Sequence, residues 1–204
     1  MTLLKDLYDR EKERLLALSE KDDPCGEYAY PVFGIGNTAA DVLLIGEAPG
    51  AEETKKSTPF VGKAGKQLDE LLELAGIERS DIYITNVVKY RPVKRKTRTV
   101  SNRTPSIKEI LTSIELLKKE ISIIEPALIV TLGNTPLKAV SMMAQTNLGT
   151  IGDCHGRPVS VSIEGKDYTV IALYHPASVI YNRTLIDVLK DDAVKMGRFA
   201  KTIC

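Results

Sequence analysis

The stretch DVLLIGEAPG, residues 41–50, decides the fold of this chain. Its first six residues are nearly all apolar, which predicts a short buried strand over 41–46. Its second half is rich in glycine and proline, which predicts a tight turn directly after that strand. Three more apolar segments predict further core strands, at residues 82–88, 126–132 and 168–173.

Helical segments alternate with these strands. Ser106 and Glu109 form a capping box at the start of one helix, and Gly76 closes another. The expected helices cover residues 3–20, 64–76, 106–121, 135–145 and 184–201. Apolar strands that alternate with helices are typical of an α/β fold with a parallel sheet covered on both faces. Residues 157–163 and 168–173 predict a hairpin around Glu164-Gly165-Lys166, whereas residues 89–105 look irregular.

The bulk composition limits the class of protein. A length of 204 residues suits one domain, residues 1–204, with an N-terminal helical extension over 1–24. The chain lacks both a signal peptide and an apolar run of the roughly 18 residues that span a membrane, so we expect a cytoplasmic protein, monomeric and without membrane contact. Its net charge of +1 means that nucleic-acid binding would require a local basic patch.

The three cysteines are far apart in the sequence. Cys25, Cys154 and Cys204 form no C-x-x-C pair, which argues against a metal or cluster site within the chain. In the cytoplasm an odd number of cysteines most simply means free thiols. We therefore predict no metal ligands.

The candidate site residues follow the predicted strands, because ligands of such folds bind outside the carboxyl ends of the strands. Glu47 comes directly after the first strand, where burial perturbs the protonation of a carboxyl group. Asn86 interrupts β-branched residues, and it either bonds a neighbouring loop or presents its amide to a polar ring edge. His175 ends the fourth strand, although a lone histidine is more often structural than catalytic. Phe60 lies between proline and glycines, with little secondary structure for its ring to pack against.

Two loops allow alternative interpretations. The glycine-rich segments 46–50 and 59–65 could form a simple tight turn or a phosphate cradle, but they match neither a Walker A sequence nor G-x-G-x-x-G. Residues 89–103 contain no acid, and they form either a solvated mobile loop or a patch that contacts phosphates. We favour the patch, whose basic residues are Lys89, Arg91, Lys94, Arg95, Lys96, Arg98 and Arg103.

Taken together, several segments resemble the family-four uracil-DNA glycosylases. They are VFGIGN, VLLIGEAPGAEE, PFVGKAG, IYITNVVKYRP, NRTPSIKE, IIEPALIVTLG and YHPA, and they occur in the order of that family. The resemblance covers about residues 31 to 185. It implies a three-layer αβα sandwich on a four-stranded parallel sheet, and an enzyme that removes uracil from DNA.

The resemblance also implies a role for each candidate residue. Phe60 would stack on an extruded uracil, Asn86 would bond its O4 and N3 edge, and His175 would stabilise the departing base near O2, whether neutral or charged. Glu47 and the main chain around Ala48 would line the place where water attacks C1′. Glu47, the main chain or His175 could activate that water. Glu53 would help to exclude the thymine methyl group. The loop Ser178-Val179-Ile180-Tyr181 would enter the gap that the flipped base leaves.

The chain departs from the family in its cysteines. The family usually holds a [4Fe–4S] cluster through four cysteines, but the region of the first two offers only Cys25. Tyr90 and Ser113 stand where the other two belong, so we predict no iron–sulfur cluster and no other cofactor. Residues 93–101, VKRKTRTVS, form an insertion whose basic residues would compensate for the missing cluster.

Three functions are compatible with the sequence. The first is hydrolysis of uracil from DNA, and it is favoured because Glu47, Phe60, Asn86 and His175 are all present. The second is a nucleic-acid-binding module with weak or no catalysis, or a glycosylase for another deaminated base. The third is an enzyme that acts on a small nucleotide, although the basic insertion argues for a polymer.

Overall fold

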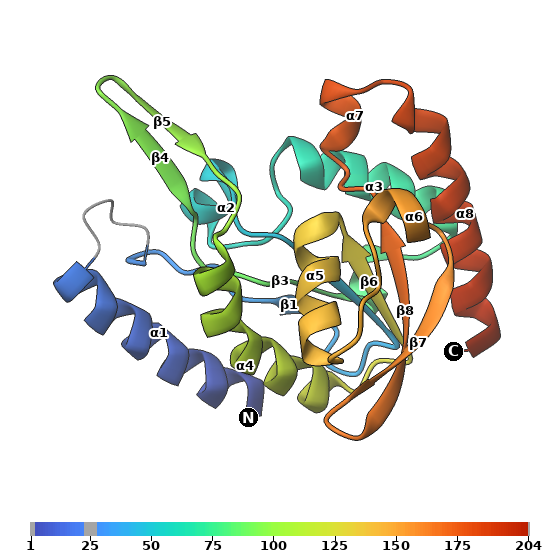
Figure 1. The fold of residues 1–204 in the computed structure, drawn as a ribbon, viewed down its shortest axis with the longest axis horizontal. Coiled ribbons are helices and arrows are strands. Elements are labelled where there is room, and N and C mark those ends of the chain that lie inside the picture. Colours follow the sequence, from blue (N-terminus) through green and yellow to red (C-terminus); the bar gives the residue numbers. More distant parts are fainter. Residues whose placement is uncertain (1–2, 23–27, 204) are drawn as a thin grey trace.

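The structure is a computed structural model that describes residues 3–22 and 28–203. A six-stranded sheet forms its centre, in the order β1-β3-β2-β6-β8-β7 (Figure 1). Its parallel strands are β2 (Val42–Gly46), β3 (Tyr83–Asn86), β6 (Leu128–Leu132) and β8 (Lys166–Leu173). These are the four predicted core strands, so the α/β class with a mostly parallel sheet is confirmed.

The expected number of strands was wrong, because two antiparallel strands extend the sheet. β1 (Ile35–Gly36) pairs with β3, and β7 (Pro158–Ile163) pairs with β8. β1 is only two residues long and exposed, so no apolar pattern predicted it. β7 is the first arm of the predicted hairpin, and it adds to the sheet because β8 otherwise has an open edge. Glu164 and Gly165 both have positive φ at the turn between them.

Helices cover both faces of the sheet. Leu43 and Ile45 of β2 point to one side, and they belong to the core cluster that includes α1 (Leu3–Asp22), α4 (Ile107–Ile124) and α5 (Asn134–Met143). Val42 and Leu44 point to the other side, toward α3 (Lys63–Ala75) and α8 (Leu185–Ile203). This alternation is the period of two that a strand buried on both faces requires. The three layers are visible in Figure 1.

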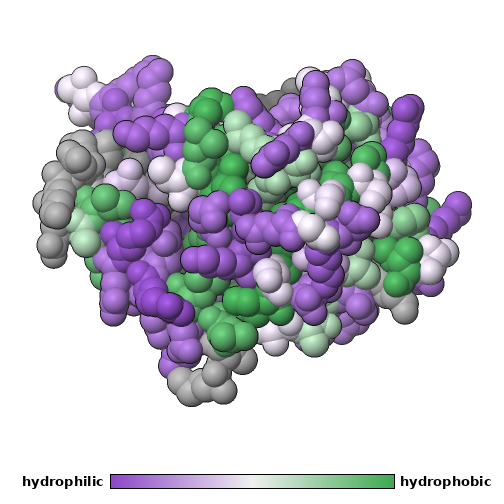
Figure 2. Space-filling model, turned by 60° about the horizontal axis from the view of Figure 1, so that its bottom comes forward, coloured by the Kyte–Doolittle hydropathy of each residue, from purple (hydrophilic) through white to green (hydrophobic). Residues whose placement is uncertain are grey.

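Four short helical elements complete the described part of the chain. They are α2 (Ala51–Lys56), η1 (Arg79–Asp81), α6 (Ile151–Cys154) and α7 (Ser178–Tyr181). The capping box of Ser106 and Glu109 and the end of α3 at Gly76 are confirmed. The side of the molecule turned forward in Figure 2 mixes hydrophilic and hydrophobic residues over its surface. Among the described residues, no helix is long and apolar enough to cross a membrane.

The segment 89–105, expected to be irregular, contains a β-hairpin. β4 (Val93–Lys96) pairs antiparallel with β5 (Thr99–Asn102), and the two strands project from the body of the molecule (Figure 1). All residues of these strands are exposed except Val93. The hairpin therefore lacks the alternation of apolar and polar residues from which a strand is predicted.

Candidate active site

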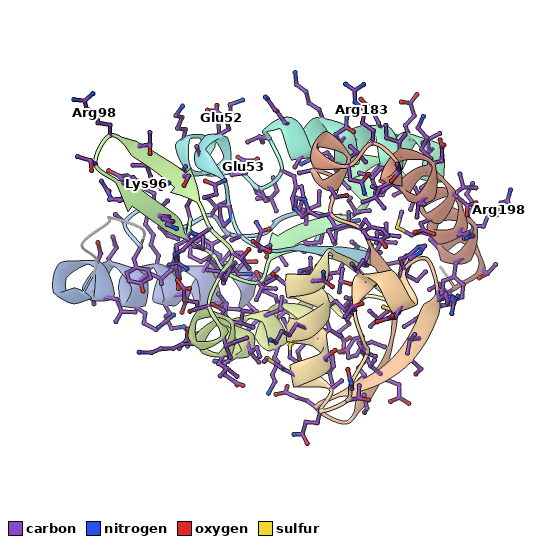
Figure 3. All side chains as sticks on the ribbon, turned by 45° about the horizontal axis from the view of Figure 1, so that its top comes forward. Glu52, Glu53, Lys96, Arg98, Arg183 and Arg198 are labelled. Atoms are coloured by element: carbon purple, nitrogen blue, oxygen red, sulfur yellow. The ribbon has the colours of Figure 1, made fainter. Side chains whose placement is uncertain are left out.

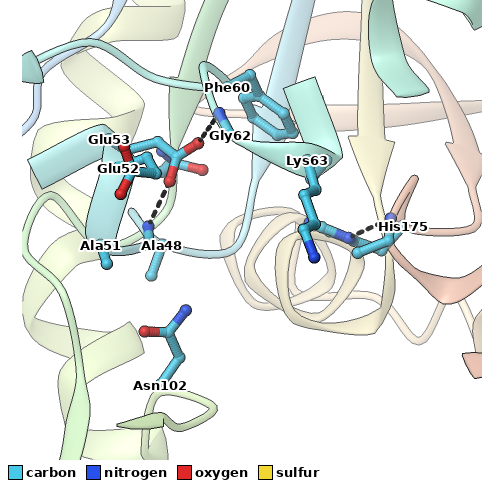
Figure 4. A pocket seen from close by; sticks show the side chains of 13 residues that line it. Ala48, Ala51, Glu52, Glu53, Phe60, Gly62, Lys63, Asn102 and His175 are labelled. Atoms are coloured by element: carbon cyan, nitrogen blue, oxygen red, sulfur yellow. Dashed lines mark hydrogen bonds between the residues drawn. The ribbon is translucent and has the colours of Figure 1, made fainter. Parts of the chain in front are cut away.

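A cavity of about 360 Å³ opens at the carboxyl ends of the parallel strands. The loop after β2 and helix α2 form one wall, the loop that holds Phe60 and the start of α3 form another, and Asn86, Asn102 and His175 complete it (Figure 4). Phe60, Asn86 and His175, which are far apart in the sequence, thus meet in one place. This is the position at which an α/β sheet binds its ligands.

Phe60 forms a fixed apolar wall of the cavity. Its φ of 52° is in the left-handed region, and its main-chain oxygen accepts a hydrogen bond of 3.0 Å from Arg79 Nη2. A Cβ on Gly46 would lie 2.6 Å from Phe60 Cζ, and one on Gly65 would lie 2.0 Å from Phe60 O. Both glycines are therefore needed for the chain to approach this residue so closely. The rings of Phe60 and His175 are nearly parallel, at 28°, with centroids 6.2 Å apart.

Asn86 ends β3 and is only 2% exposed. Its side chain lines the cavity, and none of the described residues forms a hydrogen bond with its carboxamide. The polar atoms of the carboxamide are not among the buried side-chain atoms that lack a partner, so they open into the cavity, where a ligand or water can bond them. Of the two interpretations open from the sequence, the geometry favours an amide that is presented to a ligand.

Lys89 does not belong to the basic patch in which the sequence placed it. It is 2% exposed, and its ammonium group donates to Glu120 Oε2 at 2.5 Å, to Thr85 Oγ1 at 2.7 Å and to Asn86 O at 2.6 Å. Tyr8 donates to the other oxygen of Glu120 at 2.5 Å. Burial lowers the pKa of Lys89, and Glu120 opposes this effect. Because its ammonium group is bonded inside the protein, Lys89 cannot reach a phosphate at the surface.

His175 is half-buried, and its tautomer follows from its contacts. The main-chain N–H of Ala177 donates to His175 Nδ1 at 3.1 Å, so in the neutral ring Nε2 carries the proton. Burial lowers the pKa of His175, and the charge of Glu53 only partly opposes this effect. Both observations favour a neutral ring whose Nε2 can donate, over the charged form that the sequence left open.

Glu47 lies at the edge of the site and differs from its expected place. Thr135 Oγ1 donates to Glu47 Oε2 at 2.6 Å, and among the described residues that line the cavity we find Ala48 but not Glu47. Burial raises the pKa of Glu47, and the hydrogen bond from Thr135 opposes this effect. No described residue donates to Oε1, which leaves that oxygen able to accept a bond from water.

Glu53 lines the cavity and joins its two loops. Its carboxylate accepts hydrogen bonds from the main-chain N–H groups of Gly62 at 2.7 Å, Val61 at 3.0 Å and Gly50 at 3.1 Å. Figure 4 shows the carboxylate between the two loops. Its clearest role is structural, because it holds the loop after β2 against the loop of Phe60. The expected exclusion of a thymine methyl group stays a prediction.

The base of the hairpin carries a cavity residue that sequence reasoning missed. Asn102 lines the cavity, and its Oδ1 accepts a hydrogen bond of 2.7 Å from Arg91 Nε. Arg103 donates to both oxygens of Glu109, at 2.7 and 2.8 Å, and ties the hairpin to α4. Two of the expected phosphate ligands, Arg91 and Arg103, thus hold the hairpin. The only signal for Asn102 was its place in the NRTP segment.

The other basic residues of the hairpin are exposed. Lys94, Arg95 and Lys96 lie on β4, and Arg98 lies in the turn. Figure 3 shows Arg98 at the tip of the hairpin and Lys96 on the same element. These four residues can meet a large ligand at the surface.

The segment expected to enter DNA forms α7. Ser178 Oγ is buried without a hydrogen-bond partner, and Val179 packs against the cluster of Leu71, Leu189 and Ala193. The side chains of Ile180 and Tyr181 lie outside the described part of the structure. Val179 is therefore an anchor of α7, and the insertion of this segment stays a prediction.

The residues present do not fit an iron–sulfur cluster. Tyr90, at one expected cysteine position, is buried edge-on against Tyr28 with ring centroids 4.5 Å apart. Ser113, at another, donates to Glu109 O at 2.8 Å. Cys25 lies outside the described residues, and those that are described contain no group of three or more histidines, cysteines or acids placed to hold a metal. A cluster needs thiolates where this chain has a phenol and a hydroxyl group.

Comparisons with known proteins show the family to which the chain belongs. The model of the uracil DNA glycosylase superfamily matches residues 33–196. A type-4 uracil-DNA glycosylase of Archaeoglobus fulgidus is 38% identical over 166 residues, which are 81% of this chain and 80% of that protein. Type-4 enzymes of Sulfurisphaera tokodaii, 37% identical over 84% of this chain and 75% of their own, and of Thermotoga maritima, 38% identical over 83% of both, are similarly close. The chain therefore belongs to the uracil DNA glycosylase superfamily.

Proposed function

We propose that this protein is a DNA repair glycosylase that flips uracil out of DNA and hydrolyses its N-glycosidic bond, leaving an abasic site. The observation that carries this proposal is the unpartnered carboxamide of Asn86, which is buried at the end of β3 in one cavity with Phe60 and His175. A carboxamide that bonds no described residue and opens into such a cavity is well placed to bond the polar edge of a ligand.

Asn86 selects the base. Its NH₂ group donates to O4 of uracil, and its oxygen accepts from N3–H. Cytosine has a donor at position 4 and an acceptor at N3, so both bonds would fail and leave buried polar groups unpaired. The extrusion of the nucleotide costs a few kcal/mol, and stacking on Phe60 recovers about 1–3 kcal/mol.

His175 and Glu47 act on the bond that breaks. Water attacks C1′, the C1′–N1 bond breaks, and uracil leaves with the electron pair on N1, so that the negative charge is shared by N1, O2 and O4. The neutral His175 donates from Nε2 toward O2, where the charge develops, and so stabilises the transition state more than the substrate. Glu47 Oε1, which has no described partner, accepts a proton from the attacking water. The main chain at Ala48 and the amide of Asn102 line the path of that water.

The hairpin contacts the DNA backbone. Lys94, Arg95, Lys96 and Arg98 are exposed on an element that projects beside the cavity, which is where phosphates of a bound duplex would lie. Ser178, Val179 and Ile180 follow His175 in the sequence and belong to α7. We expect α7 to approach the gap that the flipped base leaves.

We also propose that the enzyme works without an iron–sulfur cluster, as a cytoplasmic monomer with a single domain. Two contacts support the absence of a cluster. Tyr90 packs against Tyr28, and the guanidinium group of Arg103 donates to the carboxylate of Glu109. They stabilise the region that a cluster would otherwise hold together. The second candidate function, a binding module without catalysis, would not need His175 to be held as a neutral donor.

The deciding experiment is a cleavage assay on single- and double-stranded oligonucleotides that carry one uracil, followed by alkali. We expect strand breakage at uracil with the wild type and a loss of about 10²–10³ in kcat/KM for Asn86→Ala. Asn147→Ala, an exposed asparagine outside the cavity, is the matched control and should cleave like the wild type. Salt-sensitive DNA binding without breakage would instead identify a binding module or a glycosylase for another base.

A further inference from the structure

We propose that Lys63 forms a subsite for a phosphodiester group of the flipped nucleotide, at the mouth of the cavity. This inference rests on the proposed function, because it assumes that a nucleotide in DNA enters the cavity base first. Lys63 is not among the site residues predicted from the sequence, because a single lysine at a helix start usually has only a solvated side chain.

Lys63 has the right position for this contact. It is the first residue of α3, it is exposed, and it lines the same cavity as Phe60, Asn86 and His175. Figure 4 shows its side chain running from the start of α3 along the His175 side of the cavity, across from Glu52 and Glu53. The ammonium group is therefore at the opening, where the part of a nucleotide that remains outside would lie.

The charge of Lys63 is available, whereas the acids near it are already engaged. Among the described residues, none forms an ion pair with Lys63. Glu52 pairs with Lys55 at 2.9 Å, and Glu53 accepts from three main-chain N–H groups. An anion at the mouth would thus meet an unpaired cation.

Helix α3 adds to the attraction. It is 13 residues long, and its N-cap, Gly62, has no side chain to cap the first N–H groups. The start of a helix carries a partial positive charge and exposed N–H groups, which together favour phosphate. The buried, unpartnered carboxamide of Asn86 in the same cavity independently indicates a ligand, and it fixes which end of that ligand goes inward.

The chemistry favours a phosphate over the uracil anion as the group that Lys63 binds. The base end of the cavity is closed by Phe60, which is 6% exposed, and by Asn86, which is 2% exposed. An ammonium group on an exposed side chain is strongly hydrated, and it suits a phosphate that also remains in contact with water. His175 already supplies a donor for the leaving base.

The test combines variants of Lys63 with substrates that lack one phosphate charge. Oligonucleotides carry uracil with a normal backbone, or with a neutral methylphosphonate linkage directly 5′ or directly 3′ to the deoxyuridine. The variants are Lys63→Ala and Lys63→Arg, and the control is Lys66→Ala, an exposed lysine of the same helix that does not line the cavity. Thermal unfolding should be unchanged in all three, because both lysines are exposed.

We expect Lys63→Ala to lower kcat/KM roughly tenfold on the normal strand, the loss of one charge-assisted contact. One methylphosphonate should lower the activity of the wild type by a similar factor but leave that of Lys63→Ala unchanged. Lys63→Arg should retain both the activity and the sensitivity to methylphosphonate, and Lys66→Ala should behave like the wild type.

Two results would overturn the subsite. One is a Lys63→Ala variant that cleaves normally, and the other is a variant that loses activity but remains as sensitive to both methylphosphonates as the wild type. The second result would place Lys63 on the leaving base. A wild type that cleaves no uracil strand would refute the proposed function instead. The same variants and backbones would then be compared by their dissociation constants for strands that carry a tetrahydrofuran abasic site. Equal sensitivity of the wild type and Lys63→Ala to the methylphosphonate would still reject the subsite.

Discussion

The inner end of the cavity and the hairpin at its outer edge come from one stretch of the sequence, but the first is buried and the second is exposed. Asn86 ends β3 and Lys89 follows it; each is 2% exposed, and both belong to a network that includes Glu120. Lys96 and Arg98 are exposed on a hairpin that projects from the body of the molecule (Figure 1). The same residue type therefore serves opposite purposes in the two regions. Lys89 bonds the main chain of Asn86 inside the protein, whereas Lys96 is exposed and has no partner among the described residues.

The largest expected effect comes from the buried lysine. Lys89→Met would leave Glu120 as an uncompensated buried charge, and it should lower the free energy of unfolding by about 3–5 kcal/mol. The measurement is urea denaturation at neutral pH. Lys96→Met, the same substitution on the hairpin, should change stability by less than about 0.5 kcal/mol. Equal effects of the two substitutions would erase the contrast between the two regions.

The next effect isolates the aromatic wall of the inner end. Phe60→Leu keeps an apolar side chain but removes the ring face on which uracil would stack, and it should lower kcat/KM about 10- to 100-fold. Phe199→Leu is the control, since this ring packs against the same core cluster from α8 and lies outside the cavity. If both variants retained full activity, stacking would not contribute to uracil binding.

Much of the inner end could be predicted from the sequence, because local patterns determine it. The apolar runs identified the parallel strands, and their carboxyl ends identified Phe60, Asn86 and His175. The burial of Lys89 and its ion pair with Glu120 could not be predicted, because Glu120 is 31 residues away and only the packing of α4 brings it near. The roles of Arg91 and Arg103 were hidden for the same reason. Basic residues in an acid-free run look solvated until distant partners are placed beside them.

A smaller effect concerns the pH dependence of the inner end. Because burial lowers the pKa of His175 below its ordinary 6.5, the unfolded chain takes up a proton there more readily than the folded one. Stability from this group is therefore fully present above about pH 6.5 and falls as the pH drops from there toward the lowered pKa. The carbon-bound proton signals of the imidazole, followed by NMR, should titrate below pH 6.5. Titration at or above that value would refute the neutral donor, and His155 serves as the second histidine for comparison.

The smallest effect per residue is expected at the hairpin. Replacing Arg95, Lys96 and Arg98 with glutamine should leave stability and kcat nearly unchanged but weaken DNA binding, because each exposed charge contributes only a screened phosphate contact. The slope of log K against log salt should become less steep by about 0.9 for each duplex phosphate contact that is lost. The control replaces Lys190, Arg198 and Lys201 of α8 with glutamine as well. Figure 3 shows Arg198 at the opposite end of the molecule from Arg98. Both triple variants remove the same charge, so an equal change in slope would mean that overall charge rather than the hairpin attracts DNA. A change confined to the hairpin variant would show that the outer region supplies affinity while the inner region supplies selection.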